Sequence, residues 1–148
     1  MNTNGRNSWL IAAGMLSAAA ALLHIAVIFG GAEWYRFVRV PESMAQQAER
    51  GSLTPHLVTL GVVVVLMIWA AYAFAGAGLL RRLPLMKTAL VAITAVYLLR
   101  GSVLFPMLVL KPALIDGFTL WSSIIVLACG ITYGVGTWRA WSHLTKRS

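Results

Sequence analysis

The segment "TPHLVTLGVVVVLMIWAAYAFAGAGLLRR" (residues 54–82) decides the fold class of this chain. Residues 55–80 are apolar almost throughout, and about 20 such residues in a helix cross the hydrocarbon core of a bilayer. Pro55 suits the first position of a helix, and Arg81 and Arg82 suit its C-terminal end, where the helix dipole favours cations. The segment therefore predicts one membrane-spanning helix over residues 55–80.

Three further apolar segments of similar length flank it, at about 9–29, 85–110 and 117–138. The chain has 148 residues, of which 59% are hydrophobic and 11% charged, and its mean hydropathy is +0.80. Soluble domains are nearer to half apolar and about a quarter charged. We therefore expect an all-α polytopic membrane protein, in which residues 1–148 form a single domain of four transmembrane helices in a bundle.

The first apolar segment has one alternative reading, as a secretory signal. The stretch "LSAAAALLH" (residues 16–24) offers sites of the A-x-A type that signal peptidases cleave. The apolar run continues to Phe29, however, beyond the roughly 7–15 residues of a signal core. We interpret residues 9–29 as a mature helix, whereas cleavage would leave three spans.

The basic residues predict the orientation of the four spans. An even number of spans leaves both termini on one side, and cytoplasmic loops carry an excess of Lys and Arg. The terminal side holds seven cations and no acid, against four cations and four acids on the other side. We therefore expect both termini in the cytoplasm. The seven cations are Arg6, Arg81, Arg82, Lys87, Arg139, Lys146 and Arg147, and the other side holds Arg36, Arg39, Arg50 and Lys111 with Glu33, Glu42, Glu49 and Asp116.

The net charge of +8 does not indicate a nucleic-acid partner, because the basic residues are scattered between apolar runs rather than gathered in a patch. The single cysteine, Cys129, lies in an apolar stretch, so the chain has no disulfide framework and no CxxC motif. The lipid bilayer is therefore the partner that the composition predicts.

The loop between the first two spans contains a candidate short helix. The stretch "PESMAQQAERG" (residues 41–51) has proline and glutamate early, arginine late and a glycine as its stop. We expect it to lie at the membrane interface, with Trp34, Tyr35 and Phe37 as aromatic anchors.

Arg100 lies inside the third apolar segment, in "YLLRGSVLFP" (residues 97–106). A straight helix places it about 15 Å from the outer end of the span at Leu110. A cation there costs at least about 2.5 kcal/mol on insertion scales, so it should face the other helices or a wet cavity and meet an anion.

Four residues are predicted to share a polar, outward-facing pocket with Arg100: His24, Glu33, His56 and Tyr97. In one reading Arg100 forms a structural ion pair with Glu33 or another loop glutamate. In the other, its guanidinium binds the anionic group of a small amphipathic or anionic ligand. A haem reading is disfavoured because the depths of His24 and His56 differ by roughly 8 Å, whereas two axial ligands need similar depth.

Motifs for catalysis and for metal binding are missing from the sequence. GxSxG, HExxH and a glycine-rich phosphate loop do not occur, and no histidines or acids have close metal-ligand spacing. We therefore expect no catalytic residue, no metal and no cofactor, and we lean away from an enzyme.

A GxxxG pattern in the fourth segment predicts close helix packing. Gly130 and Gly134 lie one turn apart in "GITYG". Such small faces pack within one chain or between copies, so a homo-oligomer through Gly130 and Gly134 stays open.

The chain resembles a group of small four-helix inner-membrane proteins of proteobacteria whose function is uncharacterised. The resemblance lies in "LLHIAVIFGGAEWY", "TPHLVTLG", "WAAYAFAGAGLLRRLPL" and "YLLRG", about half of the chain. It implies a Gram-negative inner membrane and carries over no catalytic role. Two function classes follow from the residues: a non-enzymatic protein that binds or passes a ligand at Arg100, and an accessory subunit whose intramembrane polar residues only stabilise the bundle.

Overall fold

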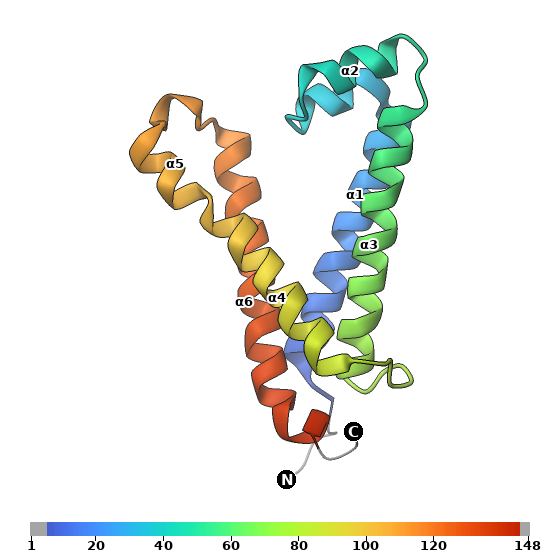
Figure 1. Cartoon of the computed structure of the whole chain (residues 1–148), viewed down its shortest axis with the longest axis vertical. Helices are drawn as coiled ribbons and strands as arrows, with labels where there is room; N and C mark the ends of the chain where they lie inside the picture. Colours follow the sequence, from blue (N-terminus) through green and yellow to red (C-terminus); the bar gives the residue numbers. More distant parts are fainter. Residues whose placement is uncertain (1–5, 146–148) are drawn as a thin grey trace. The chain divides into compact units, whose positions relative to one another are not determined.

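The computed structural model describes residues 6–145, and its regular elements over that range are all helical (Figure 1). This confirms the predicted all-α class. In chain order the elements are α1 (Ser8–Phe37), α2 (Glu42–Glu49), α3 (Thr54–Gly76), α4 (Met86–Ser102), α5 (Leu104–Leu110), a 3-10 turn (Pro112–Leu114) and α6 (Gly117–Thr145).

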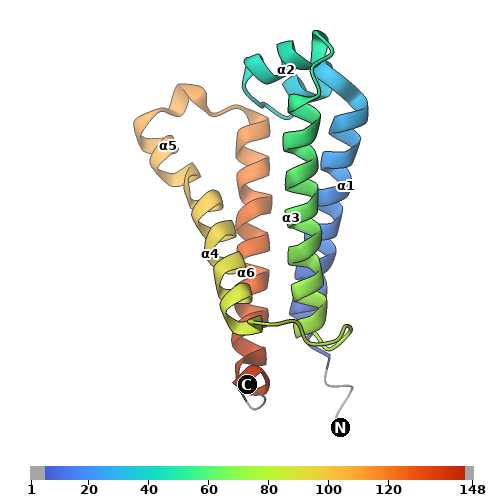
Figure 2. The same ribbon diagram turned by 45° about the vertical axis from the view of Figure 1, so that its right-hand side comes forward.

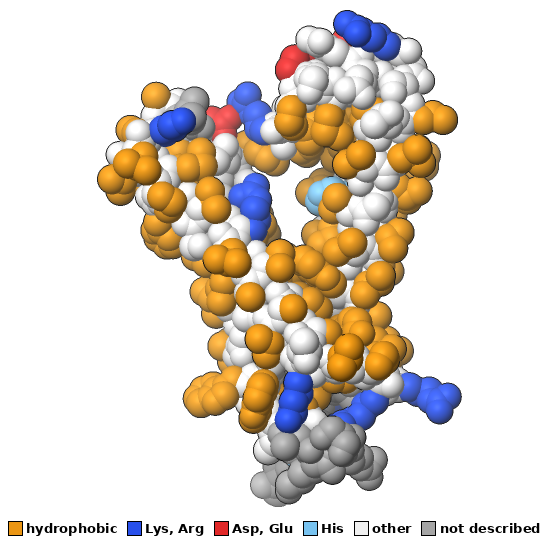
Figure 3. Space-filling view, in the orientation of Figure 1, with side chains coloured by type: hydrophobic (Ala, Val, Ile, Leu, Met, Phe, Trp, Pro, Cys, Tyr) orange, Lys and Arg blue, Asp and Glu red, His pale blue; other side chains and the backbone are white. Residues whose placement is uncertain are grey.

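Four stretches are long and apolar enough to cross a membrane, as predicted: Ser8–Phe37, Thr54–Gly76, Met86–Leu110 and Gly117–Leu144. Many of their large apolar side chains are exposed to the surroundings rather than buried within the protein. The space-filling view shows such side chains over much of the helical surface that it presents (Figure 3). A surface of this kind is stable in contact with lipid and unstable in water.

The second span ends earlier than the predicted Leu80. The helix stops at Gly76, and Gly78 adopts a left-handed conformation with φ 79°. The amide of Leu79 then donates to the carbonyl of Phe74 at 2.9 Å, which closes the helix end in a Schellman motif. The four apolar residues before Arg81 therefore belong to the connecting loop.

The first and fourth spans extend beyond their predicted ends. α1 continues to Phe37 instead of 29, although Gly31 interrupts its helical geometry with φ 63° and ψ −151°. The predicted exit near Phe29 thus marks a kink rather than an end. α6 continues to Thr145, seven residues past the predicted 138.

The third span is divided into α4 and α5 by a break at Val103. Pro106 has no amide hydrogen, so it cannot bond the carbonyl of Ser102 one turn earlier. The predicted range of 85–110 is thus covered by two helices, and Arg100 lies in the last turn of the first of them.

The short helix expected in the loop is present as α2, which ends at Glu49 just before Gly51. The chain divides into two compact units, one of Met1–Ser17 with Trp69–Ser148 and one of Ala18–Ile68. α1 and α3 contribute to both, and each unit is described by itself.

In the first unit α4 packs along α6, and the two lie side by side in both ribbon views (Figures 1 and 2). A Cβ atom added at Gly130 would lie 2.8 Å from the side chain of Leu98, and one added at Gly101 would lie 2.8 Å from the backbone of Leu127. The glycine face that includes Gly130 is therefore occupied by α4 of the same chain. A homo-oligomer through Gly130 and Gly134 stays a prediction.

The second unit has its own small core, in which Tyr35 and Ala45 are fully buried beside Val27. Its members come from both sides of the Gly31 kink and from α2. The kink therefore lets the end of α1 pack against α2.

Candidate functional site

A cluster of buried hydroxyl groups lies within the first unit. The Ser17 Oγ atom lies 2.9 Å from the hydroxyl of Tyr97 and 2.9 Å from that of Tyr133. Tyr133 in turn donates to the backbone carbonyl of Trp69 at 3.0 Å. The cluster joins α1, α3, α4 and α6, and each hydroxyl in it has a hydrogen-bond partner.

The rings of the same cluster also pack together. Tyr97 and Tyr133 are stacked, with centroids 5.4 Å apart and planes at 25°. Trp69 meets Tyr97 edge to face at 5.0 Å and 71°. Aromatic pairs of this kind contribute about 0.5–1.5 kcal/mol beyond the area that they bury. The cluster, which we call the Ser17 cluster, therefore combines apolar burial with satisfied polar groups.

Of the four members of this cluster, sequence reasoning had named only Tyr97 as a site residue. Trp69 and Tyr133 lie in mid-span rather than at the membrane interface, where these residue types are enriched. A hydroxyl in that position needs a partner from another helix. The mid-span positions of Trp69 and Tyr133 are therefore the sequence feature that points to this cluster. Ser17 has no comparable feature, because it is a small residue beside a run of alanines.

Arg100 is exposed, unlike Tyr97 one turn before it. It occupies the last turn of α4, where carbonyl groups without intrahelical partners favour a cation. Among the described residues of its own unit, its guanidinium has no hydrogen bond or ion pair. The end of α4 at Ser102 therefore lowers the electrostatic cost of the Arg100 charge without neutralising it.

The two predicted histidines lie in the second unit and are partly buried. The Nδ1 atom of His24 lies 2.7 Å from the carbonyl of Ala20, one turn back on its own helix. Because a carbonyl oxygen only accepts, Nδ1 is the donor in this hydrogen bond. His56 packs edge to face on Tyr35 at 5.9 Å, and its buried Nδ1 has no partner in the described part of the chain.

Arg36 binds two of the three loop glutamates in the second unit. Its guanidinium lies 2.8 Å from Glu42 and 2.6 Å from Glu49, and all three side chains are substantially exposed. The hydrogen bonds from Arg36 lower the pKa of both carboxyl groups, because they stabilise the charged form. Glu33 is exposed, and it is the one loop glutamate that Arg36 does not bind.

The residues of the predicted pocket are thus divided between the units. Arg100 and Tyr97 belong to the first, while His24, Glu33 and His56 belong to the second. Their convergence on one pocket stays a prediction. Within residues 6–145, no three His, Cys, Asp or Glu side chains gather in a way that would hold a metal ion.

The chain was compared with protein-family models, with curated proteins and with solved structures, and nothing matches it. The resemblance to proteobacterial inner-membrane proteins therefore stays an expectation from the sequence.

Proposed function

We propose that this chain is a non-enzymatic integral membrane protein that binds a small anionic or amphipathic ligand through Arg100. The observation that carries the proposal is an exposed guanidinium, inside an apolar span, with no partner among the described residues of its own unit. A permanent charge at that place needs an anion. The planar guanidinium fits a carboxylate or a phosphate with two parallel hydrogen bonds.

The engagement of Arg36 supports the ligand reading over an internal ion pair. Glu42 and Glu49 were candidate partners for Arg100, and both accept hydrogen bonds from Arg36 instead. Only Glu33 is left among the loop glutamates. An anion from outside the chain is then the simpler source of neutralisation.

Replacing Arg100 tests this proposal, with oleate as a carboxylate probe. Arg100→Met protein in mild detergent should keep its helical circular dichroism and its elution volume, while its affinity for oleate falls about tenfold or more, as loss of a charge-assisted pair implies. Arg50→Met removes an exposed cation outside the spans and should leave oleate binding unchanged. Equal oleate affinity in the Arg100→Met and unmodified proteins would rule the site out.

The second candidate function is an accessory subunit whose intramembrane polar residues only hold the helices together. The Ser17 cluster favours it, because every hydroxyl there is already paired within the chain. That reading expects Arg100→Met to lose its fold or its assembly. The two measurements in the preceding experiment, folding and binding, therefore separate the two functions.

We further propose that the four spans form a bundle in a bacterial inner membrane, with both termini in the cytoplasm and α2 at the outer interface. The asymmetric distribution of Lys and Arg supports this orientation. A membrane-impermeant maleimide should label a Ser43→Cys protein in intact spheroplasts, and a Ser142→Cys protein only after permeabilisation. Both serines are exposed, and the native Cys129 is buried. The reverse labelling pattern would invert the topology.

A further inference from the structure

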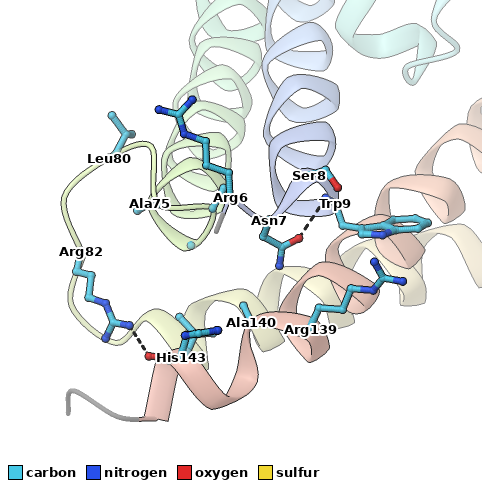
Figure 4. Close-up of a pocket in the computed structure, with 14 residues that line it drawn as sticks. Arg6, Asn7, Ser8, Trp9, Ala75, Leu80, Arg82, Arg139, Ala140 and His143 are labelled. Carbon is cyan, nitrogen blue, oxygen red and sulfur yellow. Dashed lines mark hydrogen bonds between the residues drawn. The ribbon is translucent and has the colours of Figure 1, made fainter. Parts of the chain in front are cut away.

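A cavity of about 430 Å³ lies in the first unit, where the start of α1, the loop after α3 and the last turns of α6 meet (Figure 4). This volume is within the range of small-molecule sites, about 300–1,000 Å³. Three arginines line it, Arg6, Arg82 and Arg139, and the described residues of its lining include no acid. The cavity therefore concentrates positive charge contributed by three separate segments.

The wall of the cavity is held in place by Asn7. Its Oδ1 atom accepts from the amides of Trp9 at 3.1 Å and Leu10 at 3.3 Å, which caps α1. Its Nδ2 atom donates to the carbonyl of Gly136 on α6 at 2.6 Å. One side chain thus joins the start of α1 to α6, and the adjacent Leu10 is fully buried.

Two of the three guanidinium groups are positioned by neighbours that leave donors unused. Arg139 lies over the ring of Trp9, 5.5 Å from its centroid. Arg82 donates to the backbone carbonyl of His143, as the dashed line in Figure 4 shows. Each guanidinium carries five N–H donors, and neither contact neutralises its charge. These two groups are therefore held in position, and no acidic side chain among the described residues forms an ion pair with them.

We propose that this cavity binds a phosphate group. A phosphate offers several acceptor oxygens, and its negative charge complements the positive charge of the three arginines. Arg binds phosphate with paired, charge-assisted hydrogen bonds. The phosphate comes either from the headgroup of an anionic lipid or from a soluble phosphate ester. Basic pockets between membrane helices hold anionic headgroups in this manner.

A purely topological role for these arginines is the competing explanation. Positive residues in the loops set orientation without any need to meet. That role does not explain why three arginines from separate segments line one cavity. Arg81 supplies the matched comparison, because it is an exposed neighbour of Arg82 that does not line the cavity.

The test uses the full chain in mild detergent, with native mass spectrometry of bound species. The probes are glycerol phosphate, which is soluble, and short-chain phosphatidylglycerol, with phosphatidylcholine as the lipid of zero net charge. Arg82→Gln and Arg139→Gln should each weaken binding of the effective probe about tenfold or more. Arg81→Gln, with the same change in net charge, should leave affinity within about twofold.

The pattern of results identifies the source. Binding of both anionic probes indicates a soluble phosphate ester, and binding of phosphatidylglycerol alone indicates a lipid headgroup. Arg139→Lys keeps the charge and loses the paired geometry, so it should bind more weakly than the unmodified protein and more tightly than Arg139→Gln.

Three outcomes overturn the proposal: neither anionic probe binds, phosphatidylcholine binds as tightly as phosphatidylglycerol, or Arg81→Gln weakens binding as much as Arg82→Gln. The last would mean that diffuse charge attracts the anion rather than this cavity. Circular dichroism of each variant checks that it is folded. If Arg82→Gln does not fold, Arg82→Lys replaces it in the comparison. The proposal is independent of Arg100, which lies at the far end of α4 from the loop that carries Arg82.

Discussion

The first unit contains a cluster of neutral, buried polar groups, whereas the second contains a cluster of charged, exposed ones. In the first, Ser17, Tyr97 and Tyr133 are neutral, buried and hydrogen-bonded to one another. In the second, Arg36 and the two glutamates that it binds are charged and exposed. Burying an ion costs far more than burying a paired hydroxyl. Neutral hydroxyls therefore join the helices of the first unit, whereas the ion pairs of Arg36 lie at the ends of α1 and α2.

The largest effect should come from removing the ring at the centre of the Ser17 cluster. Tyr133 is fully buried, so Tyr133→Ala creates a cavity and breaks two hydrogen bonds. We expect a loss of about 3–5 kcal/mol in the free energy of unfolding, measured by denaturant titration in mixed detergent. Tyr133→Phe keeps the packing and should lose much less. If the two variants were equally destabilised, the hydroxyl rather than the ring would dominate.

A smaller loss is expected when the shared hydroxyl is removed. Ser17→Ala deprives both tyrosine hydroxyls of a partner, which should cost about 1 kcal/mol, because hydrogen bonds between membrane helices are individually modest. A double-mutant cycle with Tyr97→Phe should show coupling between the two sites in the same unfolding assay. Strict additivity would mean that the bond contributes nothing.

Removing a buried hydroxyl that lacks a partner should have the opposite effect on the free energy of unfolding. Thr137 is 5% exposed, and its Oγ1 atom has no hydrogen bond in the part of the chain that the structure describes. Thr137→Val should therefore leave stability unchanged or raise it by up to about 1 kcal/mol. Thr94→Val is the control, since the Thr94 hydroxyl bonds the carbonyl of Leu90 at 2.7 Å. A destabilised Thr137→Val protein would contradict the rule that pairing decides the effect.

The smallest effect should be a dependence on pH confined to α2. Arg36 lowers the pKa of Glu42 and Glu49 below their ordinary value of 4.5. Their contribution to the packing of α2 is fully present above that value and is lost as pH falls through the lowered pKa. Hydrogen exchange of α2 amides, corrected for intrinsic rates, should accelerate over that interval in the unmodified protein. In a Glu42→Gln, Glu49→Gln double variant the same interval should show no transition.

Hydropathy predicted the four spans but misplaced several of their ends, whereas the short helix was predicted within residues 41–51 from its start and stop residues. The end of α3 depends on the left-handed conformation of Gly78, and the division of the third span depends on the missing amide of Pro106. Both residues are visible in the sequence. An apolar run nevertheless continues through each of them, so a hydropathy average cannot register the change in backbone direction.

The structure shows polar contacts that the sequence did not predict. That Tyr97 shares a pocket with Arg100 stays a prediction. The contacts that Tyr97 makes in the structure are with Ser17 and Tyr133, which come from distant segments. Arg36 was read only as a loop cation, whereas it binds Glu42 and Glu49. The pairing of Tyr97 with Ser17 and Tyr133 is decided by which helix faces meet, and one sequence does not encode that in its local pattern.

Composition and the lengths of the apolar runs alone predicted a helical chain with four segments apolar enough to cross a membrane, because those properties belong to single segments. Three-dimensional packing revealed the Ser17 cluster and the arginine-lined cavity, because each joins residues from segments far apart in the chain. It also revealed the Arg36 ion pairs, which depend on how the end of α1 meets α2. Burying an apolar segment in lipid is favourable for each segment by itself. Satisfying a hydroxyl or a guanidinium requires a particular partner at about 3 Å, and folding decides which partners come within that distance.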